Sequence, residues 1–246
     1  MSEFDDLTPD PRRDQMRLKA AAVFTAALIF AIAPFATGGF AGFEPSLFPV
    51  PQDDPPVQPA GYAFAIWGLI YLGLVVHGVM GLFARADRAD WDRGRWALTG
   101  SLVLGAAWIP VAQFSVPWAT VLIWLMWAGA VVALMRAPSE TWVARVPLGL
   151  YAGWLTAASS VSIGLVLAGY GVMDAVTAAL IALLLALGLA WVIQGRVGTP
   201  AYGSAVIWAL VGVVVANAAS GSMLVLVLAA LGAGAIAWRI FQGLRS

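Results

Sequence analysis

Residues 59–83 read PAGYAFAIWGLIYLGLVVHGVMGLF and contain no Asp, Glu, Lys or Arg. A helix needs about 20 mostly apolar residues to cross the hydrocarbon core of a membrane, so this stretch predicts a membrane-spanning helix. Its first half carries Tyr62, Phe64, Trp67 and Tyr71, whereas lipid-facing helices are usually built from Leu, Ile, Val and Ala. Aromatic side chains here serve as interfacial anchors, as packing or as the wall of a pocket, and the stretch alone leaves the three interpretations open.

The composition of the whole chain also indicates a membrane protein. Of the 246 residues, 61% are hydrophobic and 11% are charged, and the mean hydropathy is +0.87. A soluble domain carries about 25% charged residues, so this chain could not cover its own surface with polar groups. The absence of Cys excludes disulfides and thiolate chemistry, and a single His disfavours a metal site with several ligands.

The apolar runs predict an all-α fold, a polytopic membrane helix bundle of about eight transmembrane helices. The seventh run is short and its join to the eighth, around Asn217–Gly221, is tight, which leaves seven spans as the alternative. The predicted spans are residues 18–37, 60–83, 96–115, 118–136, 144–169, 174–194, 201–217 and 221–241.

The basic residues fall on alternate connections between these spans. All 13 Lys and Arg lie in the N-terminal tail, in the second, fourth and sixth connections, or at the C-terminal end. Because basic loops stay on the cytoplasmic side, this distribution predicts that both termini are cytoplasmic. The tail before the first span mixes acids with bases, so we expect a retained helix rather than a cleaved signal peptide.

The predicted spans contain no deeply placed Asp, Glu, Lys or Arg, which disfavours proton pumps, ion-coupled transporters and voltage sensors. His77 is the one candidate for a proton relay, and a packed histidine with a single hydrogen bond is the alternative. In the fifth span, Gly149, Gly153, Ala157 and Ser160 recur at helical spacing. Small residues in that pattern let two helices approach closely, or leave room for a flat ligand.

Tryptophan is unusually frequent, with 12 residues. Those near the predicted helix ends are explained as an interfacial belt. Phe64, Trp67 and Tyr71 share one helix face at i, i+3 and i+7, and Trp67, Trp108 and Trp124 each lie about two turns from the outer end of a span. Aromatic side chains from several helices therefore converge at one depth, either as ordinary packing or around a pocket. The tryptophans placed deeper in the spans are Trp67, Trp108, Trp124, Trp127, Trp154 and Trp208.

Three ordered segments carry a resemblance to a known family: FAIWGLIY at residues 64–71, LVLGAAWIPVAQF at 102–114 and LYAGWLTAASSVS at 150–162. They resemble the second-, third- and fifth-helix motifs of the TspO/MBR family, the tryptophan-rich sensory proteins. The matching residues of the last two segments are Trp108, Tyr151, Trp154 and Ala158.

The resemblance implies a division of the chain into three parts. These are a cytoplasmic N-terminal tail at 1–17, a TspO-like five-helix core at 18–169, and three additional C-terminal transmembrane helices at 170–246.

The chain also departs from the family pattern. Gly105 stands where the third-helix motif has asparagine, Leu150 replaces the proline before Tyr151, and Ser162 replaces a later asparagine. Two amide side chains that would orient a polar ligand are therefore missing.

What the resemblance implies is an aromatic-lined cavity that binds a porphyrin or a similar flat hydrophobic molecule, in a sensor, receptor or regulator. Tryptophan and tyrosine offer stacking area to such a ligand. Family proteins have also been linked to porphyrin breakdown, but no carboxylate, Cys or clustered His forms a catalytic constellation here, so we expect neither catalytic nor metal-binding residues. The expected ligand-binding residues are Phe64, Trp67, Tyr71, Trp108, Tyr151, Trp154 and Ala158.

The resemblance further implies a multi-pass protein of the bacterial cytoplasmic (inner) membrane. We expect no required cofactor, although a bound porphyrin, other tetrapyrrole or lipid is compatible with the cavity. The expected partners are the lipid bilayer and a hydrophobic small-molecule ligand, not nucleic acid, and a homodimer stays open.

Two alternative functions stay open beside the sensor. One is transport of an apolar or zwitterionic small molecule, because the bundle has many spans and no buried charge. The other is a structural subunit that packs against a larger membrane complex through its last three spans, which are rich in Ala, Leu and Val.

Overall fold

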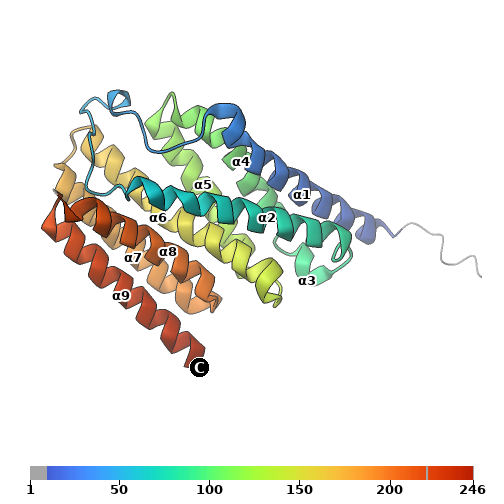
Figure 1. Cartoon of the computed structure of the whole chain (residues 1–246). Helices are drawn as coiled ribbons and strands as arrows, with labels where there is room; N and C mark the ends of the chain where they lie inside the picture. Colours follow the sequence, from blue (N-terminus) through green and yellow to red (C-terminus); the bar gives the residue numbers. More distant parts are fainter. Residues whose placement is uncertain (1–9, 220, 246) are drawn as a thin grey trace, which may run out of the picture.

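The computed structural model describes residues 10–219 and 221–245, and the secondary structure of this part of the chain is entirely helical (Figure 1). The predicted fold class, a polytopic helical bundle, is confirmed. Each predicted span coincides with one long helix, and the helix ends differ from the predicted ends by at most seven residues. The long helices are α1 (Pro11–Thr37), α2 (Ile66–Phe83), α4 (Arg95–Ala112), α5 (Val116–Met135), α6 (Val146–Gly169), α7 (Ala175–Val197), α8 (Pro200–Ala218) and α9 (Met223–Arg245).

Four short helical segments were not predicted. They lie at helix starts or in connections: η2 (Pro45–Leu47), η3 (Gly61–Ala65), α3 (Ala89–Asp92) and the π-helical turn η4 (Thr141–Arg145).

Seven helices of the described chain are long and apolar enough to cross a membrane: α1, α2 with η3, α5, α6 with η4, α7, α8 and α9. The eighth long helix, α4, lies at its predicted place beside α1 and α5. It is not among the seven because Arg95, Trp96, Thr99 and Ser101 lower its mean hydropathy. α8 and α9 are separate helices, so the last two predicted spans do not merge.

Capping residues place several helix ends. α1 begins at Pro11, within the segment assigned to the N-terminal tail, because the Asp10 side chain accepts a hydrogen bond from the Arg12 N–H at 2.9 Å. Residues 1–9 of that tail lie outside the described residues. Asp174 caps α7 in the same way through Val176 and Thr177. α7 ends at Val197 and is followed by the C-cap Gly198, whose φ of 60° is readily adopted by glycine.

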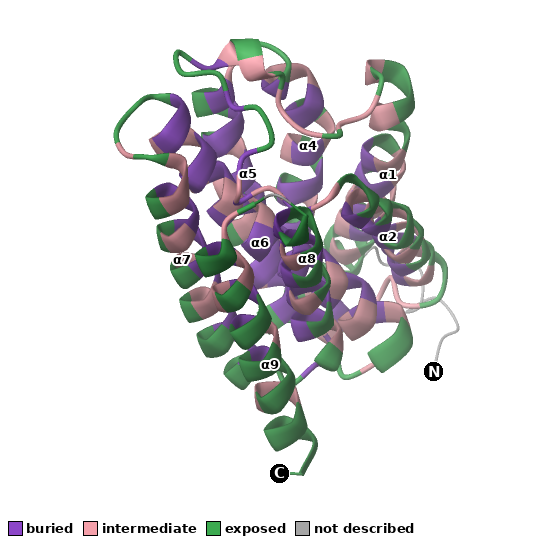
Figure 2. Ribbon diagram, turned by 60° about the vertical axis from the view of Figure 1, so that its left-hand side comes forward, coloured by how far each residue is buried: buried purple, intermediate pink, exposed green. Residues whose placement is uncertain are grey.

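The long helices form two rings that share α6 (Figures 1 and 2). In one ring, α1 packs on α2 and α4, α4 on α5, and both α5 and α2 on α6. In the other, α6 packs on α7 and α8, and both of these on α9. α6 is accordingly the most buried helix, whereas α9 buries only Val225, Ala229, Gly232 and Ile236 fully and leaves much of its length partly or fully exposed.

The glycines of α6 bring α8 close to it. A Cβ atom at Gly153 would collide with the Tyr202 carbonyl oxygen, and one at Gly149 would lie 3.0 Å from the Tyr202 nitrogen. These two members of the small-residue series therefore serve helix packing, which is one of the two interpretations that the sequence allows.

The start of α1 and the end of α9 lie at the same end of the bundle, called here the terminal end (Figures 1 and 2). Buried Arg95 joins several segments there, because its guanidinium donates to the carbonyl oxygens of Met16, Ala86 and Arg85 at 2.8–2.9 Å and of Gly81 at 3.2 Å. The opposite end, which carries residues 38–60, is called the loop end. That the terminal end faces the cytoplasm stays a prediction.

Candidate functional site: an aromatic mouth and two cavities

The first loop, residues 38–60, folds back over the mouth of the bundle and inserts aromatic side chains into it. The Phe40 ring lies edge-on against Trp108, with 4.6 Å between ring centroids. Phe43 contacts Phe40 at 5.1 Å and Trp108 at 6.1 Å. The loop therefore closes the loop end with side chains as well as with backbone. The opening that Phe40, Phe43 and Trp108 close is called here the aromatic mouth.

α6 and α8 hold this loop through backbone groups. Val50 N–H donates to the Gly169 carbonyl oxygen at 2.8 Å, and Ala60 N–H donates to that of Gly212 at 3.0 Å. The buried amide of Asn217 donates to the Pro56 carbonyl oxygen at 2.8 Å. These contacts fix both halves of the loop to the helices of the second ring.

A cavity of about 180 Å³ lies inside the first ring and is called the five-helix cavity. Its walls come from α1, η3, α2, α4, α5 and the loop: Phe30, Pro34, Phe40, Phe64, Trp67, Tyr71, Gly105, Trp108, Ile109, Ile123 and Met126. Phe30 is the centre of its aromatic wall, with ring centroids 5.1 Å from Tyr71, 5.8 Å from Trp67 and 5.7 Å from Tyr151.

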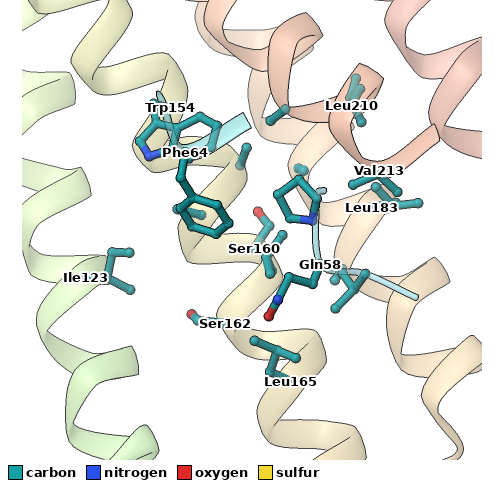
Figure 3. Close-up of a pocket in the computed structure, with 18 of the residues that line it drawn as sticks. Gln58, Phe64, Ile123, Trp154, Ser160, Ser162, Leu165, Leu183, Leu210 and Val213 are labelled. Carbon is teal, nitrogen blue, oxygen red and sulfur yellow. The ribbon is translucent and has the colours of Figure 1, made fainter. Parts of the chain in front are cut away.

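A second cavity of about 70 Å³ lies between α6, α7, α8 and the loop and is called the α6–α8 cavity (Figure 3). Its surface is almost entirely apolar. In the figure, Gln58 reaches in from the loop beside Ser160 and Ser162 of α6, and Phe64 and Trp154 stand at one side. α7 and α8 contribute Leu183, Leu210 and Val213, so two of the helices predicted to be additional wall a cavity as well as pack.

The predicted site residues divide between the two cavities. Trp67 and Tyr71 line the five-helix cavity, and Trp154 and Ala158 line the α6–α8 cavity. Phe64 and Trp108 line both. The remaining predicted site residue, Tyr151, lines neither cavity.

Tyr151 instead joins three helices. Its hydroxyl contacts the Ser101 oxygen at 2.8 Å, and the Ser101 hydroxyl donates to the Met126 carbonyl oxygen at 2.7 Å. Ser101 has already used its proton, so Tyr151 is the donor to Ser101. The phenol group of Tyr151 is thus occupied by a buried link between α6, α4 and α5.

Polar groups inside the cavities are few. Trp108 Nε1 donates to the Ala119 carbonyl oxygen at 2.8 Å, which fixes this ring. Trp154 Nε1 is buried and has no hydrogen-bond partner among the described residues. The Ser160 and Ser162 hydroxyls donate to the carbonyl oxygens of Thr156 and Ser159, so each keeps an oxygen that can accept. No charged side chain of the described chain lines either cavity.

The polar outer half of α6 also ties the two rings together. The Thr156 hydroxyl donates to the Ala152 carbonyl oxygen at 2.9 Å. Its oxygen accepts from Trp127 Nε1 of α5 and from the Tyr202 hydroxyl of α8, each at 2.9 Å. This buried network explains Thr156 by packing rather than by ligand contact.

The contacts of His77 and Trp124 are explained by packing within the bundle. His77 Nδ1 donates to the Val143 carbonyl oxygen at 2.8 Å, and its ring stacks on Trp91 at 4.8 Å near the terminal end. Trp124 packs against Trp127 at 5.1 Å and lines neither cavity. The described residues hold no group of three His, Cys, Asp or Glu side chains placed to bind a metal ion.

The volumes of the two cavities limit the size of ligand that fits in this conformation. An apolar cavity of about 150 Å³ binds benzene, whereas drug-sized ligands occupy about 300–1,000 Å³. The five-helix cavity, at about 180 Å³, therefore accommodates a single ring. A larger flat molecule requires Phe40 and Phe43 to leave the mouth.

Sequence reasoning missed Phe30, Phe40 and Phe43, because their motif-free surroundings give no sign of where they point. The one hint in the sequence of a bulky neighbour such as Phe30 is the glycine at position 105. A Cβ atom at Gly105 would lie 2.5 Å from Phe30 Cε2, so the phenylalanine ring occupies the space next to the residue that replaces the family's asparagine.

Comparison with known families adds an independent observation. A sequence model of the family described as TSPO-like protein matches residues 50–241, which is more than half of the chain. The chain belongs to this family. The TSPO-like match confirms the resemblance inferred from the three ordered segments. Comparisons with curated proteins and with solved structures gave no match.

The TSPO-like match begins in the first loop and ends in α9. It thus includes α7, α8 and α9, which we predicted to be additional to a five-helix core at 18–169, and it leaves out α1. The division at residue 170 stays a prediction.

Proposed function

We propose that this membrane protein is a ligand-binding sensor or regulator whose aromatic mouth takes a porphyrin or a similar flat hydrophobic molecule. The observation that carries the proposal is the convergence of aromatic rings from α1, η3, α2, α4, α6 and the first loop on two adjoining apolar cavities. Membership of the TSPO-like family supports it.

The closed mouth suggests how such a ligand would bind. Phe40 and Phe43 are held mainly by ring contacts with Trp108, Phe64 and Phe48. A flat macrocycle offers the same edge and face contacts, so it can replace these two rings against Trp108 and Phe64. On this proposal the first loop is the cover of the site, and the ligand joins the five-helix cavity to the α6–α8 cavity.

The proposal is tested by titrating the purified protein with protoporphyrin IX and following tryptophan fluorescence. We expect saturable quenching at micromolar porphyrin. Phe64→Ala, at one of the positions that line both cavities, should raise the half-saturation concentration about tenfold, equivalent to about 1.4 kcal/mol of binding free energy. Trp67→Ala and Trp154→Ala should raise it as well, each through one cavity.

Trp238→Ala is the matched control, because this tryptophan is exposed on α9 and far from the mouth. It should lower the total fluorescence and leave the half-saturation concentration unchanged. Quenching that does not saturate, or that responds equally to Phe64→Ala and Trp238→Ala, contradicts the proposal.

A further inference from the structure

A groove between α7 and α9 lies at the terminal end, away from the aromatic mouth. Its volume is about 670 Å³. α7 contributes Gln194 and Gly195 to its wall, and α9 contributes Trp238, Arg239, Gln242 and Arg245.

The groove is basic, and no acidic side chain among residues 10–219 and 221–245 neutralises it. The sequence contains no Asp or Glu after Asp174. Among the described residues, neither Arg239 nor Arg245 forms an ion pair with a carboxylate. No described carboxylate therefore neutralises their positive charge, which favours binding of an external anion.

Arg239 is held in place against α7. Its guanidinium lies over the Trp191 ring, with 5.2 Å from Cζ to the ring centroid. It also lies directly against Gly195, where a Cβ atom would collide with Nη2. Nη1 donates to the Gln242 side-chain oxygen at 3.5 Å, and Nε is buried without a hydrogen-bond partner among the described residues. The Arg239 guanidinium is thus fixed in position against α7, while its N–H groups form only one long hydrogen bond that the structure describes.

An exposed apolar track leads from this groove toward the middle of the bundle. On α7, Leu184, Trp191 and Gly195 share one face at helical spacing, and on α9 Leu231 and Trp238 do the same. All four large side chains are exposed. In a bilayer these residues face the acyl chains, and the tryptophans lie near the headgroup level.

We propose that the groove binds the phosphate headgroup of an anionic glycerophospholipid, with its acyl chains along the apolar track. A phosphodiester offers oxygens for the parallel donors of a guanidinium. Basic pockets between transmembrane helices suit anionic headgroups for this reason. A zwitterionic lipid brings its own cation beside the phosphate and gains less from two arginines. This site is separate from the aromatic mouth and does not rest on the function proposed for it.

The test uses the purified full-length protein in mild detergent. It is titrated with phosphatidylglycerol or with phosphatidylcholine of the same acyl chains, and bound lipid is counted by native mass spectrometry. We expect phosphatidylglycerol to bind more tightly than phosphatidylcholine. Because one basic residue near a membrane contributes about 1 kcal/mol, Arg239→Gln should weaken phosphatidylglycerol binding about fivefold. Arg245→Gln should weaken it in the same direction.

Arg196→Gln is the matched control, since Arg196 is an exposed arginine at the terminal end of α7 that does not line the groove. It should leave lipid binding unchanged. Arg239→Lys keeps the charge but loses the planar fork, so it should show intermediate affinity. Equal binding of the two lipids, equal effects of Arg196→Gln and Arg239→Gln, or displacement of phosphatidylglycerol by millimolar inorganic phosphate would each overturn the proposal.

Discussion

At the scale of single residues, Gly105 and Phe30 determine the shape of the five-helix cavity. Gly105 lies on α4 where the related motif has asparagine, and the Phe30 ring of α1 occupies the adjoining space. An aromatic ring contributed by another helix thus fills the space beside residue 105. This packing keeps that wall of the cavity apolar and favours a ligand that is recognised by stacking.

We expect Gly105→Ala to lower the stability of the folded protein by about 1–3 kcal/mol, because its Cβ atom would displace the buried Phe30 ring. Gly100→Ala on the same helix is the control, since a Cβ atom there meets nothing within 4 Å. Alanine favours helix over glycine by about 1 kcal/mol, so the control should be neutral or stabilising. Thermal unfolding in detergent measures both variants. Equal unfolding temperatures would show that Phe30 yields freely.

Asp87 is a second residue with a consequence that can be measured. Hydrogen bonds from Arg17 and then from Arg13 lower the pKa of its carboxyl from 3.8 to about 2. Because the folded-state pKa lies below the unfolded value, these pairs stabilise the folded protein above about pH 4. This contribution is lost as the pH falls through about 2.

Asp87→Asn should therefore lower the unfolding temperature at pH 6, and the difference from the unsubstituted protein should vanish toward pH 2. Asp53→Asn is the control, because Asp53 forms no ion pair with a described residue. An Asp87→Asn difference that is constant from pH 6 to pH 2 would exclude this ion pair as its source.

At the scale of elements, α8 holds the first loop in place. Asn217 donates to the Pro56 carbonyl oxygen, and its own side-chain oxygen accepts from the Ser222 N–H at 3.0 Å. Trp208 Nε1 donates to the Ala63 carbonyl oxygen at 2.8 Å, where the loop enters η3. A helix from the C-terminal third of the chain therefore anchors a loop from the first quarter, which is the proposed cover of the site.

Asn217→Ala should open this cover more often. A Val57→Cys probe in the otherwise cysteine-free chain reports the opening through its rate of alkylation, because Val57 is a buried residue of the loop that lines the α6–α8 cavity. The loss of a buried hydrogen bond, about 1 kcal/mol, should raise that rate about fivefold. Gln194→Ala removes a buried amide at the opposite end and should leave the rate unchanged. An unchanged rate in Asn217→Ala would show that ring contacts alone hold the cover.

At the scale of the whole molecule, eight long helices place the start of α1 and the end of α9 on one side, and the distribution of Lys and Arg predicts which side this is. Ser46→Cys in the first loop and Ala89→Cys in α3 place exposed thiols at opposite ends of the bundle. In intact cells whose outer membrane is permeabilised, a membrane-impermeant maleimide should label Ser46→Cys at once. It should label Ala89→Cys only after lysis, and the reverse order would invert the topology.

The sequence predicted the helices well because a bilayer fixes their length and requires every backbone group to be paired internally. It predicted the shared face of Trp67 and Tyr71, because helical spacing is a local property. It did not predict which side chains meet across helices. Tyr151 matched a family motif but bonds to Ser101, and Phe30 matched none but centres the aromatic wall. Such pairings depend on how the helices rotate against one another, which spacing within one helix does not specify.

The wall shared by the two cavities has a thermodynamic consequence. Phe40, Phe64, Trp108 and Ile123 face both, so a ring that rotates to enlarge one cavity takes volume from the other. Two small occupants, one in each cavity, would then compete without touching. Each would weaken the other by the same factor, because linkage between binding sites is reciprocal. A single ligand large enough to fill both would meet no such antagonism, so this arrangement favours one extended guest over two compact ones.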